Sequence, residues 1–277
     1  MGAAGVRPIQ PYLNPRSRQA EGLRAWWPVV PFTGAASTTH MTIAESGPSG
    51  GRYPATLPSL ASNFTTCFGH PTHGVVARGN TASTVGAPVT NGADLVEIPT
   101  SYNFAMFFRA SHTLFEASAL AAMSFNGTDD LIVYPYSTDA NGPRVFWRDL
   151  GGTIINAAFA IADGHMHDFC FVSYASNDHR LFVDGNQFAT STATGTAGPF
   201  SGMSLMGYSE SGGQGFRGSI CDFRLYDRAP SAALIKAMSA PATRWDLYWQ
   251  PNPRAYAFVQ AEAAASRPNY SMLLGVR

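Results

Sequence analysis

The chain consists of short apolar segments separated by glycine, proline and small polar residues. The clearest alternation of the two kinds of residue occurs over 218–226, where Phe223 and Leu225 alternate with Asp222 and Arg224. A period of two is typical of a β-strand that buries one of its faces. We therefore predict that 218–226 is the best-defined strand of the protein.

Similar apolar segments predict a series of further strands, with turn-forming residues between them. The predicted strands are 25–30, 75–77, 95–98, 103–110, 120–125, 131–136, 144–148, 153–160, 167–174, 181–183, 187–189 and 203–206. Asp184-Gly185-Asn186 is a strong signal for a tight hairpin. Residues 33–72 are rich in Thr, Ser, Gly and Pro and are expected to form a long loop, which is functional or packed on a partner. Short strands joined by such turns favour an antiparallel β-sandwich.

One short helix is predicted over 232–239, with Leu234, Ile235 and Met238 facing inward. The remaining pattern divides the chain into three parts. We expect an extended N-terminal arm over 1–21, a sandwich over 22–241, and a C-terminal tail over 242–277. The tail is too apolar for a solvated segment, so it is expected to dock on the sandwich or on a neighbouring subunit.

The two terminal parts contain the residues that we expect to bind a partner. The arm is rich in proline and basic, and the tail opens on an aromatic cluster. The candidate partner-binding residues are Arg7, Arg16, Arg18, Trp245, Tyr248 and Trp249.

Composition narrows the classes of partner. Hydrophobic residues make up 45% of the 277 residues and charged residues only 13%, and the net charge is zero with a pI of about 7.1. A neutral chain lacks the basic surface by which proteins hold nucleic acid, so no nucleic-acid partner is expected. The sequence shows no signal peptide and no apolar stretch long enough to span a membrane, so we expect neither export nor membrane binding.

The three cysteines cannot form a disulfide framework. Cys170 and Cys221 lie in predicted core strands, where a free thiol behaves as a small apolar group. The alternative is a single bridge between these two residues.

Four segments carry a resemblance to a known family. They are GLRAWWP (22–28), YNFAMFFR (102–109), HDFCFVSYASNDHRLFVDG (167–185) and FRGSICDFRLYDRAPSAALIKAM (216–238). Together they resemble the laminin-G-like, concanavalin A-like domains, although Cys221, Pro230 and Leu234 depart from the family pattern. The resemblance covers residues 22–240 and implies an all-β antiparallel sandwich of the concanavalin A-like jelly-roll type. Lectins, hydrolases, adhesins and virion proteins share this architecture, so function has to be argued from sites.

No catalytic motif stands out. The paired carboxylates that glycoside hydrolysis requires occur on one strand in the laminarinase-like enzymes of this fold, and no such run is present. The nucleophile elbow G-x-S-x-G and the phosphate-binding G-x-x-x-x-G-K-[ST] are also absent. We therefore predict that the protein is not an enzyme, with glycoside hydrolase as a third alternative.

Metal and cofactor candidates are few. The zinc-like spacing of Cys67, His70 and His73 lacks a fourth ligand, so these are interpreted as ordinary loop residues. The family resemblance implies that calcium could bind at the rim of the sandwich, with Asp129, Asp130 and Asp184 as the carboxylates. No cofactor is expected, since Asp184 is explained by its hairpin alone.

Sugar binding would use exposed aromatic rings beside polar groups. The candidates are Trp147, Tyr134, Tyr136 and Tyr208. The alternative is that these strand aromatics belong to the core.

Two functions remain open. The first is a structural subunit of a tailed-phage virion, either a capsid decoration or cement protein or a tail or fibre module. TRWDLYWQPNPRAYAFV (243–259) resembles the segments that follow the sandwich in such proteins. The partners would be other virion subunits, including copies of this chain, and the location would be the virion. The second is a carbohydrate-binding, lectin-like adhesion module that recognises surface glycans.

Overall fold

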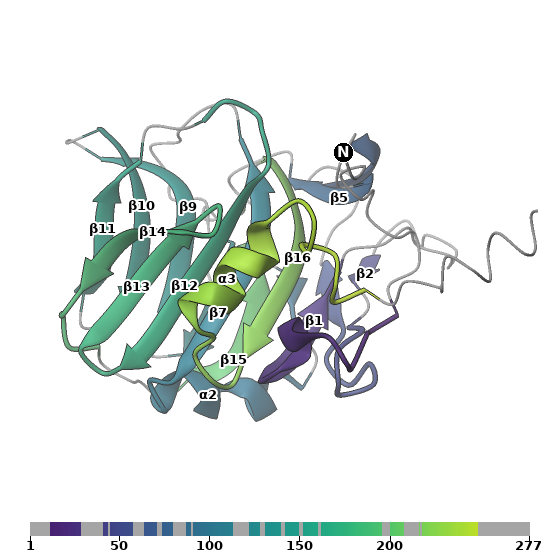
Figure 1. Ribbon diagram of the computed structural model, residues 1–277, viewed down its shortest axis with the longest axis horizontal. Coiled ribbons are helices and arrows are strands. Elements are labelled where there is room, and N and C mark those ends of the chain that lie inside the picture. Colours follow the sequence, from purple (N-terminus) through teal and green to yellow (C-terminus); the bar gives the residue numbers. More distant parts are fainter. Residues whose placement is uncertain are drawn as a thin grey trace, which may run out of the picture.

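The computed structural model describes two β-sheets that face each other, with a helix on the outside of one of them (Figure 1). The residues that the structure describes are 12–28, 41–43, 45–57, 64–70, 74–79, 87–89, 91–112, 122–127, 131–139, 142–149, 152–159, 162–195, 200–207, 216 and 218–248.

The larger sheet has eight strands. They are β1 (Leu23–Trp27), β4 (Phe64–His70), β5 (Gly74–Gly79), β7 (Phe104–Ser111), β12 (His167–Ala175), β13 (Asp178–Val183), β14 (Asn186–Ser191) and β16 (Gly218–Tyr226). Their order is β14-β13-β12-β7-β16-β5-β4, and β1 also pairs with β16. We call this the eight-stranded sheet.

The second sheet has six strands. They are β6 (Ala87–Pro88), β8 (Met123–Gly127), β9 (Leu131–Asp139), β10 (Gly142–Asp149), β11 (Gly152–Ala158) and β15 (Phe200–Leu205). Their order is β11-β10-β9-β8-β15-β6, and β2 (Met41–Ile43) pairs with β3 (Ala55–Leu57) beside them. The pairings described between these strands are antiparallel, so the predicted antiparallel sandwich is confirmed.

The space between the sheets is filled with aromatic side chains. Phe108 on β7 stacks on Phe169 and Phe171 of β12, with ring centroids 5.5 and 6.0 Å apart. Trp147 from β10 meets Phe171 edge-on from the opposite sheet at 5.9 Å. These contacts join the two layers, because each sheet presents one residue in two to the other.

The outer face of the eight-stranded sheet is also covered. Helix α3 (Ala232–Ser239) lies across it, followed by the turn-rich residues 241–248 (Figure 1). Ser231 caps the helix by accepting a hydrogen bond from the amide of Leu234 at 3.3 Å. Ile235 and Met238 are fully buried in a second apolar cluster, which also contains Phe107 of β7. The helix and its inward residues agree with the sequence-based prediction.

Two expectations about local structure were wrong. Residues 95–98 were predicted as a strand, but they lie in a 3-10 turn (η2, Gly92–Leu95) and the four-residue helix α2 (Glu97–Thr100). Pro99, which follows directly and lies in α2, lacks the N–H that a strand ladder needs, and of residues 95–98 only Leu95 is buried. The long loop predicted over 33–72 contains three strands, β2, β3 and β4. The threonines that suggested a loop there are equally suited to strands.

The hairpin predicted at Asp184-Gly185 connects β13 to β14. Both residues have positive φ, 51° and 77°, as a two-residue hairpin of this kind requires. In the described parts of the chain, no helix is long and apolar enough to cross a membrane.

Candidate functional site

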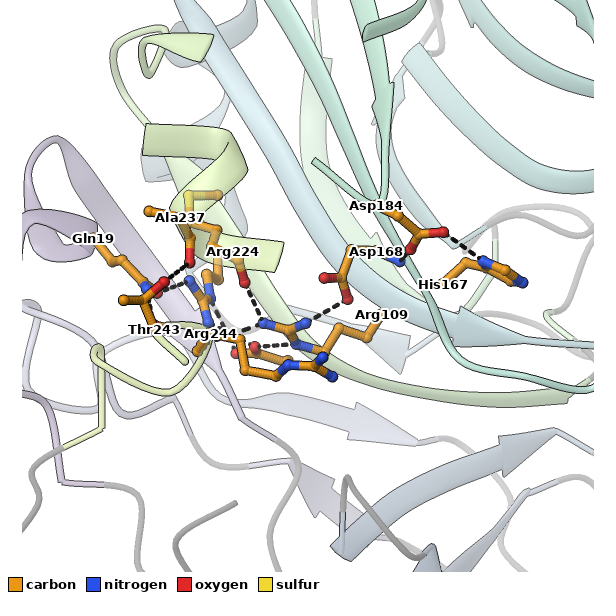
Figure 2. Close-up of polar contacts among 11 residues, drawn as sticks. Gln19, Arg109, His167, Asp168, Asp184, Arg224, Ala237, Thr243 and Arg244 are labelled. Atoms are coloured by element: carbon orange, nitrogen blue, oxygen red, sulfur yellow. Dashed lines mark hydrogen bonds and ion pairs between the residues drawn. The ribbon is translucent and has the colours of Figure 1, made fainter. Parts of the chain in front are cut away.

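Four charged residues lie buried between the outer face of the eight-stranded sheet and the segments that cover it. They are Arg109, Asp168, Asp222 and Arg224, which we call the buried charge network. Figure 2 shows Arg109, Asp168 and Arg224 of this network. Arg109 stands at its centre. Its Nε donates to Asp222 Oδ2 at 2.8 Å, and its Nη1 donates to Asp168. Its Nη2 donates to the carbonyl of Met238 in α3 at 2.9 Å.

Asp222 owes its position to a local irregularity of β16. The register with β7 shifts between Cys221 and Arg224, and Asp222 has a φ of 57°. Aspartate tolerates this left-handed region better than most residues. Its Oδ1 accepts a hydrogen bond from the indole of Trp26 at 2.8 Å, and both of its oxygens accept from Arg224.

The network holds both ends of the described chain. Arg224 Nη1 donates to Gln19 Oε1 at 2.7 Å, and Gln19 Nε2 donates to the carbonyl of Thr243 at 2.5 Å. The guanidinium of Arg109 also lies 4.7 Å from the ring centroid of Trp245. The buried charge network thus binds three separate segments to the sheet. They are the segment around Gln19, helix α3 and residues 241–248.

Burial decides what this network can do. The side chains of Arg109, Asp222 and Arg224 have no exposed surface. Burial opposes the charge of Arg109, but Asp168 and Asp222 outweigh it and raise its pKa. Both arginines stay ionised and no ligand reaches them, so the network connects elements of the fold rather than binding a substrate.

A histidine lies at the edge of this network. His167 Nδ1 is 2.8 Å from Asp184 Oδ2, and its Nε2 is 3.2 Å from Asp163 Oδ1. Asp184 in turn accepts a hydrogen bond from the amide of Asp168 at 2.9 Å. The hydrogen bond with Asp184 is the main cause that raises the pKa of His167. Burial opposes ionisation of Asp184, but the contacts with His167 and the Asp168 amide lower its pKa.

These directions predict how stability depends on pH. Protonated His167 stabilises the fold fully below its ordinary pKa of 6.5, and this contribution disappears as the pH rises through its raised folded-state pKa. His167→Gln should therefore cost stability at about pH 6 and much less at about pH 9. Urea denaturation of both proteins across this range measures the difference. A gap that stays constant with pH would contradict the assignment.

A second feature is an open hollow on the surface beside β1, with a volume of about 220 Å³. We call it the β1 hollow. Its lining consists of Leu23, Arg24, Pro48, Ser49, Arg52, Tyr53 and Asp227. Two arginines, an aspartate, a serine and a tyrosine therefore line one small space.

The loop that forms one wall of the β1 hollow is organised around Glu45, which is 4% exposed. Its carboxylate accepts hydrogen bonds from the amides of Gly47 at 2.5 Å and Gly51 at 2.9 Å, and from the hydroxyl of Ser49. The loop is also held at its end, where Trp27 Nε1 donates to the carbonyl of Tyr53 at 2.6 Å. The wall is therefore preorganised.

The sequence analysis did not single out the residues of the β1 hollow. Arg24 and Asp227 flank strands that were recognised only as scaffold, and 45–53 lay in the segment predicted to be a loop. A signal was present in ESGPSGGRY (45–53), where three glycines lie between an acidic and a basic residue. Nothing in the sequence shows that this segment lies beside Asp227.

The predicted glycan-binding aromatics lie elsewhere. Trp147 and Tyr136 have no exposed surface, and Tyr134 is 3% exposed. A sugar cannot stack on rings that are packed inside the protein, so these three residues are corrected to core residues. The structure favours the alternative that strand aromatics belong to the core. Tyr208 lies outside the described residues.

The predicted partner-binding residues divide in a similar way. Trp245 and Tyr248 are buried in their own chain, where Tyr248 meets Trp26 edge-on at 4.7 Å, so neither is free to contact a neighbour. Arg16 and Arg18 are exposed. Arg7 and Trp249 lie outside the described residues.

Part of the N-terminal arm is also different from the expectation. Residues 12–21 are not an extended arm, since Leu13 forms a β-bridge with Tyr248 and a 3-10 turn (η1) spans Arg18–Ala20. The physical reason is that Gln19, 2% exposed, is held by the buried charge network.

The described residues that we considered as metal ligands do not form a metal site. Asp184 is occupied by His167 and the Asp168 amide, while Asp129, Asp130 and His73 lie outside the described residues. Cys67 and His70 lie on β4. Within the described segments, no three His, Cys, Asp or Glu residues are grouped to hold a metal ion.

The predicted free state of Cys170 and Cys221 is confirmed. Cys170 belongs to the outer cluster and Cys221 to the core between the sheets, so the two thiols lie on opposite faces. Burial raises the pKa of the Cys170 thiol, which keeps it protonated.

Comparisons with known proteins agree with the architecture. Residues 82–236, more than half of the chain, match the laminin-G-like family described as the concanavalin A-like lectin/glucanases superfamily. No curated protein matches the sequence.

Three solved structures illustrate the fold. A sialidase of Trypanosoma rangeli in complex with the inhibitor DANA has a TM-score of 0.51 at 13% identity, covering 78% of this chain and 32% of that one. A mutant of that sialidase displaying trans-sialidase activity has a TM-score of 0.50 at 14% identity, covering 88% and 37%. Domain 4 of AbnA, an extracellular arabinanase of Geobacillus stearothermophilus, has a TM-score of 0.48 at 10% identity, covering 73% and 98%. The chain thus spans about a third of the sialidases.

The two sialidase structures contradict the prediction that the protein is not an enzyme. That prediction rested on missing motifs, whereas the same sandwich forms part of sialidase chains. At this level of identity, the likeness establishes the fold and assigns no reaction to this chain.

Proposed function

Because this chain belongs to the concanavalin A-like lectin/glucanases superfamily, we propose that it recognises carbohydrate and that the β1 hollow is the binding site. The observation that carries the proposal is the lining of the hollow. Arg24 and Arg52 supply directed N–H donors and Asp227 supplies an acceptor, while the Ser49 hydroxyl, which donates its hydrogen to Glu45, can accept. Sugar hydroxyl groups need this mixture of donors and acceptors at fixed positions.

The size of the hollow limits what it can hold. Pockets for drug-sized ligands usually exceed roughly 300 Å³, and this one is smaller at about 220 Å³. It is also open on one side, as Arg52 is 58% exposed in its side chain. We infer that it accepts one terminal sugar ring, with the rest of the glycan outside.

Saturable binding on a glycan array by the full chain is the expected result. Asp227→Ala should weaken this binding about tenfold, because hydroxyl groups of the ligand lose a charged acceptor. Arg228→Ala is the matched control. This neighbour is exposed and pairs with Glu21 at 3.2 Å, outside the lining, so its loss should leave binding unchanged. The absence of any saturable signal would refute the proposal.

A second role is favoured by the positions of the chain's two outer segments. Leu13 pairs with Tyr248, and the amide of Asn14 donates to the carbonyl of Leu247 at 2.8 Å. Residues 1–11 and 249–277 therefore join the described region at neighbouring points. They carry the basic, proline-rich sequence and the continuation of the aromatic cluster.

Because the two outer segments join the described region close together, both could contact the same part of a large assembly. We propose a subunit of a tailed-phage virion, with other virion subunits and copies of this chain as partners and the virion as its location. The likeness of 243–259 to segments of such proteins is its second support. Mass spectrometry of purified virions should detect the chain at a fixed stoichiometry, and its absence from them would refute this role.

A further inference from the structure

We propose that the ligand of the β1 hollow carries a carboxylate group, so that the protein recognises an acidic sugar, with Arg24 as the residue that binds the acid. This inference rests on the proposed carbohydrate-binding function and names the ligand class. It follows from the charges that line the hollow and from the rigidity of its wall.

Of the two arginines that line the β1 hollow, only Arg52 has an ion-pair partner among the described residues. Arg52 forms an ion pair with Asp94 at 2.5 Å, and its guanidinium lies 5.6 Å from the ring centroid of Tyr53. Arg24 has no hydrogen-bond or ion-pair partner in the described part of the chain. It lies in the lining of the hollow, where it is free to bind an anion.

A β-bulge explains why Arg24 is exposed. The pairing of β1 with β16 shifts register between Leu23 and Ala25, and both of these residues are buried while Arg24 is not. A bulge redirects one side chain out of the alternation of the strand. Since β1 is packed in the sandwich on either side of this point, the arginine is mounted on a rigid element.

The opposite wall is equally well ordered. Gly50 and Gly51 have φ values of 70° and 89°, which residues with a side chain rarely adopt. A Cβ at Gly47 would lie 2.5 Å from Glu45 Oε1 and 2.9 Å from the amide nitrogen of Trp26. The tight turn around the Glu45 carboxylate thus requires glycine, and it holds Ser49 and Arg52 at the hollow before any ligand arrives.

Asp227 distinguishes a carboxylate from a phosphate. Once Arg52 is paired with Asp94, the hollow retains one positive charge on Arg24 and one negative charge on Asp227. Asp227 would repel a dianionic phosphate more strongly than a singly charged carboxylate, which matches the single guanidinium and can accept two parallel hydrogen bonds from it. Asp227 then accepts hydrogen bonds from sugar hydroxyl groups.

Isothermal titration calorimetry on the full chain tests this assignment with four ligands. The ligands are galacturonate, its methyl ester, galactose and galactose 6-phosphate. Where the glycan array identifies an oligosaccharide ligand, each sugar is also titrated as the terminal residue of a short oligosaccharide. We expect galacturonate to bind at least about tenfold more tightly than the other three. Arg24→Ala should abolish this preference, so that galacturonate and galactose bind with equal affinity. Arg24→Lys, which keeps the charge but not the planar fork, should retain only part of it.

Arg180→Ala is the control, since Arg180 is a partly exposed arginine that pairs with Asp178 on β13 and is not among the lining residues of the hollow. Equal affinity for galacturonate and its ester, tighter binding of the phosphate, or a preference that survives Arg24→Ala would each overturn the inference. The proposed function would still stand if neutral sugars bind and Asp227→Ala weakens them. It would fail together with this inference only if no sugar binds.

Discussion

Replacing Asp222 with asparagine is expected to destabilise the protein by about 3 to 5 kcal/mol. The side chain of Asp222 is fully buried and accepts hydrogen bonds from Arg109, Arg224 and Trp26. The amide that replaces it has no charge and only one acceptor oxygen. Arg109 would then keep Asp168, whereas Arg224 would lose the carboxylate with which it pairs, and an uncompensated buried charge is costly.

The matched control is Asp178→Asn. This aspartate pairs with Arg180 at 2.9 Å, but its side chain is 40% exposed, and exposed ion pairs contribute only about 0 to 1 kcal/mol. Chemical denaturation of both variants measures the two effects. If the two variants are equally stable, the buried charge network does not hold the covering segments on the sheet.

Trp147→Ala is expected to destabilise the protein by about 3 to 5 kcal/mol. The ring lies between the sheets, meeting Phe104 and Phe171 edge-on at 5.9 Å each and His179 at 5.1 Å. Removing it leaves a cavity that the two packed layers cannot easily close. Thermal or chemical denaturation measures the loss.

Phe188→Ala provides the comparison, because Phe188 is an aromatic residue with 42% of its surface exposed. Its loss should cost less than about 1 kcal/mol. The same pair of variants separates the two interpretations of Trp147. Weaker glycan binding with unchanged stability would restore it as a ligand-binding residue and contradict its place in the core.

Several elements were predictable because their signals are local. The strand 218–226 and the helix 232–239 have in the structure the bounds that the pattern indicated, as β16 and α3. A two-residue alternation and a capped apolar helix depend on neighbours within a few residues, so the sequence contains all the information needed. The strand predicted over 95–98 was wrong because its local signal is ambiguous. A short apolar run does not distinguish a strand from a helical turn.

The site was less predictable, because its parts come from distant segments. Arg24, Arg52 and Asp227 are ordinary surface residues in the sequence, and only the pairing of β1 with β16 and the packing of 45–53 bring them together. Likewise, aromatic residues in alternating strands suit both a core and a binding face. The opposite sheet decided the matter by covering Trp147.

By itself, the sequence determined the class of fold, the family and most of the strands. Asp222 and Arg224 illustrate what the sequence could not predict, namely which polar residues of a strand become buried. Their alternation with Phe223 and Leu225 correctly puts them on the other face of β16, and such a face normally meets water. The tertiary structure instead covers it with α3 and 241–248 and turns these charges into a buried charge network. Burial depends on segments far along the chain, which no local pattern encodes.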